Sequence, residues 1–481
     1  MPDEILISTA LLRSAGATAG VEGSRLPGGA EVARILRRLG LETAMDPGTA
    51  ASGDEEAPDI YCVLQTGNEA FGSRDAAPPL QRETILRTVR AMSRRRTGRV
   101  ILITDSGQHI NVWADPARSA QRAADLHWFR HLTARAAGHG ITGNEVTVGY
   151  APFLGHRLKP EREQQFLGGL LIPRFAVPDD LTAALRMLAS RGAAHLAGET
   201  VPLTGGMNTH LVPPNVARMS RPVTAGRAPA GSGDPFSIAG RVVLLAGATS
   251  RTGRAVAREL ARRGAALAVV ARRPESLEQI VAELREIGAT AWGIPADLTD
   301  PGSAELVVDR FWDITSGIDV MIYAAGKFDF DVIGDNRERR GRMLGINLCS
   351  FAEMCDALAE RWILTRRPGT VVSVGMAHAN MPAVPHVQTY GSSKAAMVDH
   401  TRLLAATGSR YGIRANSVCT GAVRCHGQPD WYDGMAGLVC YLASPASSYV
   451  TGAAITLDGD SGLAHSGAPL RYTHREQLLD W

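Results

Sequence analysis

The sequence is poor in lysine, in one-sided charge and in long apolar runs. Only three of its 51 basic residues are lysine, and 48 acidic residues leave a net charge of +3. Binding nucleic acid by charge alone needs a far larger basic excess, so no nucleic-acid partner is predicted. No apolar run approaches the roughly 18 residues that span a bilayer. Residues 1–10 lack the basic start and apolar core of a signal peptide, so we predict a cytoplasmic protein without a membrane partner.

Cysteine is scarce as well. Six cysteines in 481 residues make no disulfide framework, and no two of them have the CxxC spacing of a metal or redox site. The sequence therefore predicts buried, reduced thiols and no metal site. The cysteines are Cys62, Cys349, Cys355, Cys419, Cys425 and Cys440.

What is present is the composition of a folded protein, with 45% apolar and 21% charged residues. The length allows two to four domains. A stretch rich in proline, glycine, alanine and serine, residues 212–237, is predicted to be a linker. It separates a first domain, 1–211, from a second domain, 238–463. Residues 464–481 are polar and are predicted to form a tail.

The second domain alternates continuous apolar strands with amphipathic helices. This pattern predicts an α/β fold, a doubly wound parallel sheet with its ligand at the carboxyl ends of the strands. The predicted strands are 241–248, 266–272, 290–296, 319–326, 369–375, 413–421 and 453–459. The predicted helices are 253–264, 275–288, 304–315, 339–362, 390–412 and 434–444.

The first domain shows the same alternation near its end. Its segment "DDLTAALRMLASRGAAHLAGETVPLTGG" resembles "GMAGLVCYLASPASSYVTGAAITLDG" of the second domain, some 250 residues later. A spacing this long indicates an internal duplication rather than a solenoid repeat. We therefore predict two related α/β domains in tandem.

A glycine-rich turn, "AGATSRTGRAVA", joins the first strand of the second domain to its first helix. Such a turn brings backbone N–H groups and a helix N-terminus against a pyrophosphate. Gly247 and Gly253 are present, but Arg251 replaces the middle glycine of a GxxxGxG pattern. Thr249 and Thr252 complete the predicted phosphate-binding turn.

The second strand ends in "VVARRPES". A fold that prefers NAD places an acidic residue there, to bind the ribose hydroxyls. Arg272 and Arg273 instead offer planar cations for a 2′-phosphate, which favours NADPH as the cofactor. The alternative is a solvated arginine pair in an arginine-rich chain.

Four further motifs follow in a set order and spacing: "ADLTD" with Asp297, "IYAAG" with Ala325 and Gly326, "GINL" with Asn347, and "YGSSK" with Tyr390 and Lys394. Together they resemble the short-chain dehydrogenase/reductase family over nearly the whole second domain. The resemblance implies a Rossmann-like fold. Ala325, Gly326 and Asp297 would then join the turn in binding the cofactor.

The resemblance also implies the catalytic residues. On a helix, i and i+4 share one face, so Lys394 lies one turn from Tyr390. An ammonium there is expected to lower the pKa of the phenol, which gives or takes the proton at a carbonyl oxygen. Lys394 would also hold the nicotinamide ribose, and Asn347 would complete a proton relay.

The sequence departs from the family where a serine normally follows the fifth strand. Met376 or Ala377 falls in that position, and neither donates a hydrogen bond. Ser373 comes three residues too early. His378 lies in a stretch that usually lines the substrate pocket; it either supplies the missing donor or is simply a pocket histidine.

The segment that covers the substrate in the family is also short here. After Thr420 and Gly421 only about fourteen residues precede the next helix. This predicts an open pocket, or one covered by another segment, with Trp431 and Tyr432 as candidate wall residues.

The first domain is predicted to be degenerate and structural. Its first predicted strand, 4–16, enters no glycine-rich turn, and alignment of "RSAQRAAD" with "YGSSKAAM" places Arg118 and Arg122 at the tyrosine and lysine. Arginine stays protonated at neutral pH and does not act as a proton donor. The tandem layout is similar to the high-molecular-weight β-ketoacyl-carrier-protein reductases, which implies a homodimer with four lobes.

The sequence therefore predicts an NADPH-dependent ketoreductase that acts on a small or carrier-bound carbonyl substrate. The composition, rich in alanine, glycine and arginine, is compatible with bacterial secondary metabolism. Two alternatives stay open: a reductase-derived enzyme without net redox chemistry, such as a cyclase, dehydratase or isomerase, and a non-catalytic scaffold.

Overall fold

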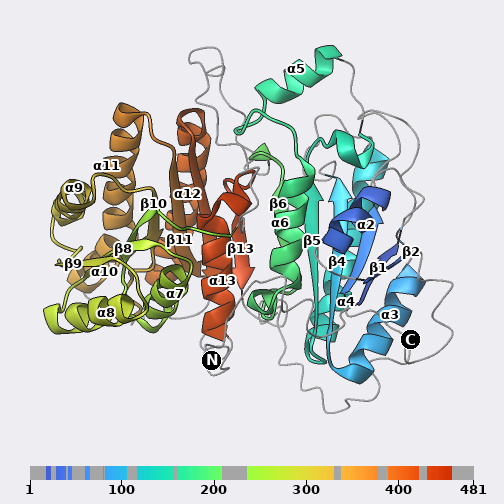
Figure 1. The fold of residues 1–481 in the computed structure, drawn as a ribbon, viewed down its shortest axis with the longest axis horizontal. Helices are drawn as coiled ribbons and strands as arrows, with labels where there is room; N and C mark the ends of the chain where they lie inside the picture. Colours follow the sequence, from blue (N-terminus) through green and yellow to red (C-terminus); the bar gives the residue numbers. More distant parts are fainter. Residues whose placement is uncertain are drawn as a thin grey trace. The chain divides into compact units, whose positions relative to one another are not determined.

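The computed structural model describes most of the chain: residues 18–22, 29–38, 42–45, 60–65, 80, 82–105, 116–156, 160–207, 236–329, 337–376, 388–421 and 431–457. The chain forms two compact units, whose described parts are 18–207 and 236–457 (Figure 1). Nearly all of the predicted linker, the predicted tail and the predicted strand at 4–16 lie outside the described residues. The domain boundaries therefore stay predictions.

The second unit is built on a seven-stranded sheet in which every neighbouring pair is parallel, as predicted. Its order is β13-β12-β11-β10-β7-β8-β9. The strands are β7 (Val242–Ala246), β8 (Ala266–Ala271), β9 (Ala291–Pro295), β10 (Val320–Tyr323), β11 (Gly369–Met376), β12 (Ile413–Thr420) and β13 (Ala454–Leu457). The central strands are buried on both faces because their residues are almost all apolar.

Helices cover both faces of this sheet. On one face α7 (Arg251–Arg262), α8 (Pro274–Glu286) and α13 (Trp431–Ala443) pack together, and on the other lie α9 (Ser303–Thr315), α11 (Ser350–Thr365) and α12 (Gln388–Gly408) (Figure 1). The predicted helix 339–362 is wrong as a single α-helix. It consists of α10 (Arg337–Leu344), a π-helical turn (Gly345–Cys349) and α11.

The strand order reverses between β7 and β10, which lie side by side in the sheet but are joined through the β8–β9 half. In a doubly wound sheet such a reversal opens a crevice at the carboxyl ends of the two strands. The predicted cofactor and catalytic motifs all follow the ends of β7 to β11, or lie on helices beside them.

The first unit repeats this plan with six parallel strands in the order β2-β1-β3-β4-β5-β6. The strands are β1 (Thr18–Glu22), β2 (Glu42–Met45), β3 (Ile60–Gln65), β4 (Gly98–Asp105), β5 (Ile141–Val148) and β6 (Thr200–Leu203). The helices are α2 (Gly29–Arg38), α3 (Arg82–Arg95), α4 (Pro116–Ala137), α5 (Pro160–Gly168) and α6 (Pro178–Ala189). If β6 is matched with β13, the strands of the two sheets correspond one to one in their spatial order. Among the described residues, only β9 has no counterpart in the first unit.

A buried asparagine links strand to loop at the same place in both units. In β12, Asn416 donates from Nδ2 to the Val450 oxygen at 3.0 Å and accepts from the Ala453 N–H at 3.0 Å. In this way one amide satisfies two backbone groups of the turn before β13.

In β5, Asn144 makes the same pair of bonds, to the Leu196 oxygen at 2.6 Å and from the Glu199 N–H at 3.2 Å. Asn144 and Asn416 are both the fourth residue of an eight-residue strand. A shared side-chain clamp at one position supports the internal duplication that the sequence predicts.

Removal of this clamp should destabilise one unit at a time. Asn416→Ala leaves a buried N–H and a buried carbonyl without their partner, and each such group costs roughly 1–3 kcal/mol. We expect the free energy of unfolding of the second unit to fall by about 2–4 kcal/mol. In calorimetry, Asn416→Ala should lower the unfolding temperature of the second unit. The matched control, Asn144→Ala, should lower that of the first unit instead. A single transition that moves equally in both variants would contradict separate units.

Four cysteines are buried, as predicted, and one is not. Cys349, the last residue of the π-helical turn, is exposed. Cys425 lies outside the described residues. The buried cysteines are Cys62, Cys355, Cys419 and Cys440. Among the described helices, none is long and apolar enough to cross a membrane.

Candidate active site

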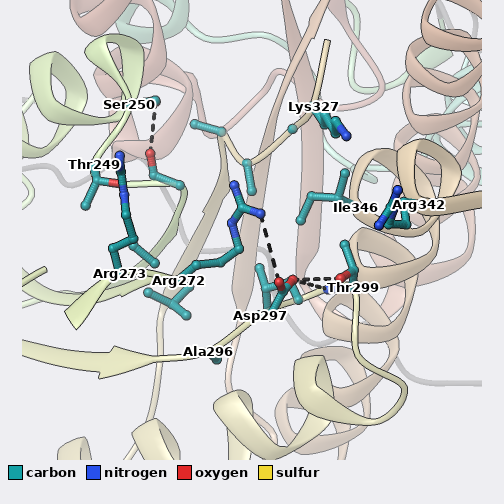
Figure 2. Close-up of a pocket in the computed structure, with 17 residues that line it drawn as sticks. Thr249, Ser250, Arg272, Arg273, Ala296, Asp297, Thr299, Lys327, Arg342 and Ile346 are labelled. Carbon is teal, nitrogen blue, oxygen red and sulfur yellow. Dashed lines mark hydrogen bonds and ion pairs between the residues drawn. The ribbon is translucent and has the colours of Figure 1, made fainter. Parts of the chain in front are cut away.

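A cavity of about 500 Å³ lies at the carboxyl ends of β7, β8, β9 and β10 (Figure 2). Its wall comes from the loops after these four strands, from α10 and from the π-helical turn that follows α10. The lining residues are Gly247, Thr249, Ser250, Val270, Ala271, Arg272, Arg273, Ala296, Asp297, Leu298, Thr299, Ala324, Ala325, Gly326, Lys327, Arg342 and Ile346. Seven of the predicted cofactor-binding residues are therefore brought together in one place.

The glycine-rich turn closes one side of the cavity. Gly247 has φ +85°, and a Cβ there would lie 2.6 Å from the Ala325 nitrogen, so only glycine fits. Ser250 caps α7 by accepting the Gly253 N–H at 2.9 Å, and it lines the cavity although the sequence analysis did not single it out. Its position before the first helical residue was the available signal.

Arg251 and Thr252 stay predicted cofactor-binding residues. They are the first two residues of α7 and do not line the cavity. Gly253 does not line the cavity either, and its N–H donates to Ser250 Oγ, the cap of α7. The N-terminus of α7 still faces the turn, and its unpaired N–H groups favour an anion there.

The two predicted arginines stand at the end of β8 and are solvent-accessible. Arg272 is 72% exposed and reaches across the cavity toward Asp297, with Nη1 3.9 Å from Oδ2 (Figure 2). Thr299 donates to Asp297 Oδ1 from its backbone N–H at 2.9 Å and from its hydroxyl at 2.7 Å. Partial burial acts to raise the pKa of Asp297, but these bonds and the charge of Arg272 hold it below its usual value.

The opposite side of the cavity carries two cations that the sequence analysis did not place there, Lys327 and Arg342 (Figure 2). Lys327 Nζ lies 3.8 Å from Asp329 Oδ2, and Arg342 Nη1 lies 3.4 Å from Glu338 Oε1. The lining thus holds four cations and one carboxylate, which suits a ligand with several phosphate charges.

Tyr390 and Lys394 both lie on α12, one turn apart. Lys394 is 3% exposed, and its Nζ donates to the Val374 oxygen at 3.2 Å. Burial lowers the pKa of Lys394 to about 8. Burial raises the pKa of Tyr390, which is half-buried.

The pKa of Tyr390 is thus raised and not lowered in this arrangement, and the expected effect of Lys394 on the phenol stays a prediction. The Lys394 ammonium donates to a strand carbonyl, and loss of water around the phenol is the cause of its raised pKa. A phenol with a raised pKa keeps its proton at neutral pH.

Asn347 occupies the middle of the π-helical turn and is fully buried. Its Oδ1 accepts the Lys327 N–H at 2.8 Å, and its Nδ2 donates to the Lys327 oxygen at 3.0 Å and to Ser393 Oγ at 3.0 Å. Ser393 Oγ in turn donates to the backbone carbonyl oxygen of Tyr390 at 2.7 Å. The side chain thus fixes the loop after β10 to the first turn of α12.

Gly326 makes room for these side chains. A Cβ at Gly326 would lie 3.0 Å from Asn347 Oδ1 and 3.1 Å from Lys394 Nζ. Any other residue would push against the amide or the ammonium. The end of β10, the π-helical turn and α12 therefore meet at this glycine.

Met376 is the last residue of β11, the strand that bears Val374. Its side chain lies outside the described residues, as do Ala377 and His378. Ser373 is buried and bonded to the hydroxyls of Thr401 and Ser417, at 2.9 and 2.7 Å. Its hydroxyl therefore faces the sheet core. The role predicted for His378 stays a prediction.

The two candidate wall residues begin α13. Trp431 is fully buried, and its ring meets the half-buried ring of Tyr432 edge-on at 5.2 Å. Neither residue lines the described cavity. The Trp431 side chain packs in the interior at the start of α13, where every residue except Tyr432 and Asp433 is buried.

The first unit carries an ion pair at the corresponding place. β4 and β11 both run eight residues from a glycine, so Asp105 matches Met376. Arg122, at the lysine position, is 2% exposed, pairs closely with the Asp105 carboxylate and donates to its backbone oxygen at 3.3 Å. Burial lowers the pKa of Arg122 to about 10, so it stays charged at neutral pH. Arg118 lies on α4, but its side chain is outside the described residues.

Comparison with known proteins gives consistent matches. A family model described as "short chain dehydrogenase" matches residues 241–434. The 2,3-dihydro-2,3-dihydroxybenzoate dehydrogenase of Bacillus subtilis (strain 168) is 31% identical over 186 residues, which cover 38% of this chain and 70% of that protein. Cyclohexanol dehydrogenase of Rhodococcus sp. (strain TK6) is 29% identical over 278 residues, covering 48% of this chain and 99% of the relative.

Among solved structures, a short-chain type dehydrogenase/reductase from Mycobacterium marinum is 28% identical, with a TM-score of 0.45, and covers 49% of this chain and 98% of that one. With the parallel sheet, the glycine-rich turn and the Tyr390–Lys394 pair in place, the chain belongs to the short-chain dehydrogenase family. The family match falls in the second unit.

The buried Lys394 should make stability depend on pH. Its pKa falls from 10.5 in the unfolded chain to about 8 in the folded protein, so the unfolded state binds more protons between these values. Stability should therefore rise with pH from about 8 to about 10.5, by roughly 3 kcal/mol at most. Lys394→Met should remove this rise from denaturant titrations taken at a series of pH values. If the stability of both proteins changed with pH by the same slope, the pKa of Lys394 would not be lowered in the folded protein.

Proposed function

We propose that the second unit is an NADPH-dependent reductase of a carbonyl substrate. The observation that carries this proposal is the pair Tyr390 and Lys394, held one turn apart beside a cationic cavity at the carboxyl edge of the sheet. A proton donor, a buried ammonium and a phosphate-binding turn are the parts that carbonyl reduction by a nicotinamide cofactor requires.

The cavity fits such a cofactor, because Gly247 leaves the space beside Ala325 that a side chain would fill. The turn and the start of α7 would hold the pyrophosphate, and Asp297 lies where the adenosine end is bound in doubly wound folds. Arg272 and Arg273 support NADPH over NADH, since a 2′-phosphate pairs with guanidinium and no acidic residue stands at the end of β8.

The reduced nicotinamide supplies a hydride to the carbonyl carbon when it is bound. Tyr390 acts as the general acid at the carbonyl oxygen, and its raised pKa keeps the proton available at neutral pH. Lys394 stabilises the phenolate that forms and orients the ribose. Asn347 is a positioning residue. It binds the Lys327 backbone and, through Ser393, the backbone of Tyr390.

The absent serine sets the expected rate. One donor that stabilises a developing oxyanion contributes on the order of 10²–10³ in rate, and Met376 supplies none. His378 or a water is the substitute that we propose. Met376→Ser should raise kcat/KM for simple ketones by at least about tenfold, measured by NADPH absorbance. An unchanged rate would indicate that the oxyanion is already fully stabilised.

The missing donor is also the observation that favours a second candidate, a reductase-derived cyclase, dehydratase or isomerase. The deciding experiment follows NADPH absorbance in the presence of a panel of ketones and β-ketothioesters. We expect oxidation of NADPH with at least one of them. Tight binding of NADPH without oxidation, together with conversion of substrate detected by mass spectrometry, would favour the non-redox candidate.

The first unit is proposed to be structural, because Arg122 is engaged with Asp105 and no tyrosine–lysine pair takes its place. The tandem form would then be similar to the high-molecular-weight β-ketoacyl-carrier-protein reductases, with a carrier-bound substrate. The homodimer, the cytoplasmic location and a place in bacterial secondary metabolism also stay predictions. Cofactor found in the first unit would overturn its structural role.

A further inference from the structure

An aromatic side chain stands exposed next to the catalytic tyrosine. The ring of Phe328 meets the ring of Tyr390 edge to face, with centroids 4.9 Å apart and an interplanar angle of 81°. Phe328 is 49% exposed, whereas Tyr323 and Phe351, which make the same kind of pair nearby, are fully buried. Half of a phenylalanine ring is therefore open to solvent beside the proposed proton donor.

Phe328 is held in place by its neighbours on both sides. Lys327, just before it, has both backbone groups bound by Asn347 at 2.8 and 3.0 Å. Asp329, just after it, forms an ion pair with Arg339 of α10 and lies 3.8 Å from Lys327 Nζ. The backbone that carries Phe328 is thus fixed by the same amide that positions the turn of Tyr390. A large apolar ring is thus held at a fixed surface position beside Tyr390.

We propose that Phe328 is a specificity-determining residue, the aromatic wall of the substrate site, and that it selects a carbonyl compound whose neighbouring group is a flat apolar ring. This inference rests on the proposed function, since it takes Tyr390 as the group that meets the carbonyl oxygen. A flat ring attached to the carbonyl carbon would lie against the open part of Phe328 when the oxygen reaches the phenol. Aromatic pairs of this kind favour binding by about 2- to 10-fold beyond the burial of apolar area.

A second role for Phe328 must be separated from this one. The ring also removes water from Tyr390, whose pKa is raised by burial. If shielding were its only role, a smaller side chain would change the rate for all ketones alike and would shift the pH profile. A wall that contacts substrate instead changes the ratio between ketones.

The test compares acetophenone with cyclohexyl methyl ketone, which have similar size but differ in flatness. For the protein as it stands, we expect a higher kcat/KM for acetophenone. Phe328→Leu keeps an apolar side chain and should lower the ratio of the two values by about 5-fold, mainly through the KM of acetophenone. Phe328→Tyr keeps the ring and should preserve the ratio. Leu403→Ala, which trims an apolar side chain 53% exposed elsewhere on α12, is the matched control and should preserve it too.

Binding without turnover separates this proposal from the proposed function. Calorimetric titration of the two ketones into the protein saturated with NADP⁺ gives their ratio of dissociation constants whether or not hydride transfer occurs. If no ketone is reduced, the proposed function fails, and the binding ratio still decides the role of Phe328. A ratio unchanged in Phe328→Leu, or an equal loss for both ketones, overturns the proposal.

Discussion

Replacement of Tyr390 by phenylalanine should abolish carbonyl reduction. The variant keeps the ring and its edge-to-face contact with Phe328, and it loses only the hydroxyl that is proposed to give its proton to the carbonyl oxygen. A general acid contributes roughly 10²–10⁴ in rate, and here the phenol is also a proposed hydrogen-bond donor to the oxygen, where the usual serine is missing. We therefore expect kcat/KM to fall by at least about 10³-fold, measured by NADPH absorbance with the best ketone of the panel.

Two controls show whether the loss is chemical. Tyr411→Phe removes a hydroxyl from a half-buried tyrosine just beyond α12 and should leave the rate unchanged. The dissociation constant of NADPH, from fluorescence titration, should be the same in Tyr390→Phe as in the parent. If Tyr390→Phe still turns over the true substrate at the parental rate, the proton-donor role fails.

The second large effect concerns the choice of cofactor. We expect the protein to bind NADPH about 100-fold more tightly than NADH, because a charge-assisted hydrogen bond contributes roughly 1.5–3 kcal/mol and two guanidinium groups are available. The double variant Arg272→Ala, Arg273→Ala should bring the two dissociation constants within about 3-fold by weakening NADPH alone. Binding of NADPH by the parent should also weaken as salt is added.

Arg258→Ala is the matched control for this pair. Arg258 is partly exposed on α7, is paired with Glu283 and does not line the cavity, so its loss removes one positive charge without touching the proposed phosphate site. It should not change the preference for NADPH. Equal affinities of the parent for NADPH and NADH would refute the assignment, and a variant that loses affinity for both cofactors equally would show that Arg272 and Arg273 position the whole dinucleotide.

The sequence predicts the sheet of the second unit well because its strands are buried on both faces and read as continuous apolar runs. Val243 to Ala246 and Leu267 to Val270 are fully buried. The break at Gly345–Cys349 was not predictable, since one extra residue in a helical turn leaves no mark on the apolar pattern. The burial of Trp431 was not predictable, because an aromatic residue after a loop fits a pocket wall and a buried helix start equally well.

The sequence predicted those residues of the site that belong to a motif. It missed the residues that only the folded chain brings to the cavity. Gly247, Arg272 and Asp297 stand at fixed places after strands, so the sequence located them at the cavity. Lys327 and Arg342 are fifteen residues apart, and neither belongs to a motif that the chain order alone identifies. The bonds from Asn347 to Lys327 that give the loop its shape depend on side-chain geometry, which spacing does not reveal.

The π-helical turn makes the active site sensitive to length as well as to residue type. Each residue of an α-helix advances about 100° around the axis, so loss of one residue from 345–349 would restore a regular helix and rotate everything before it by that amount. Asn347 would then turn away from Lys327 and Ser393 although no site residue had been replaced. Substitutions at the exposed Cys349 should be tolerated, while a deletion there should disable the site as effectively as loss of the asparagine itself.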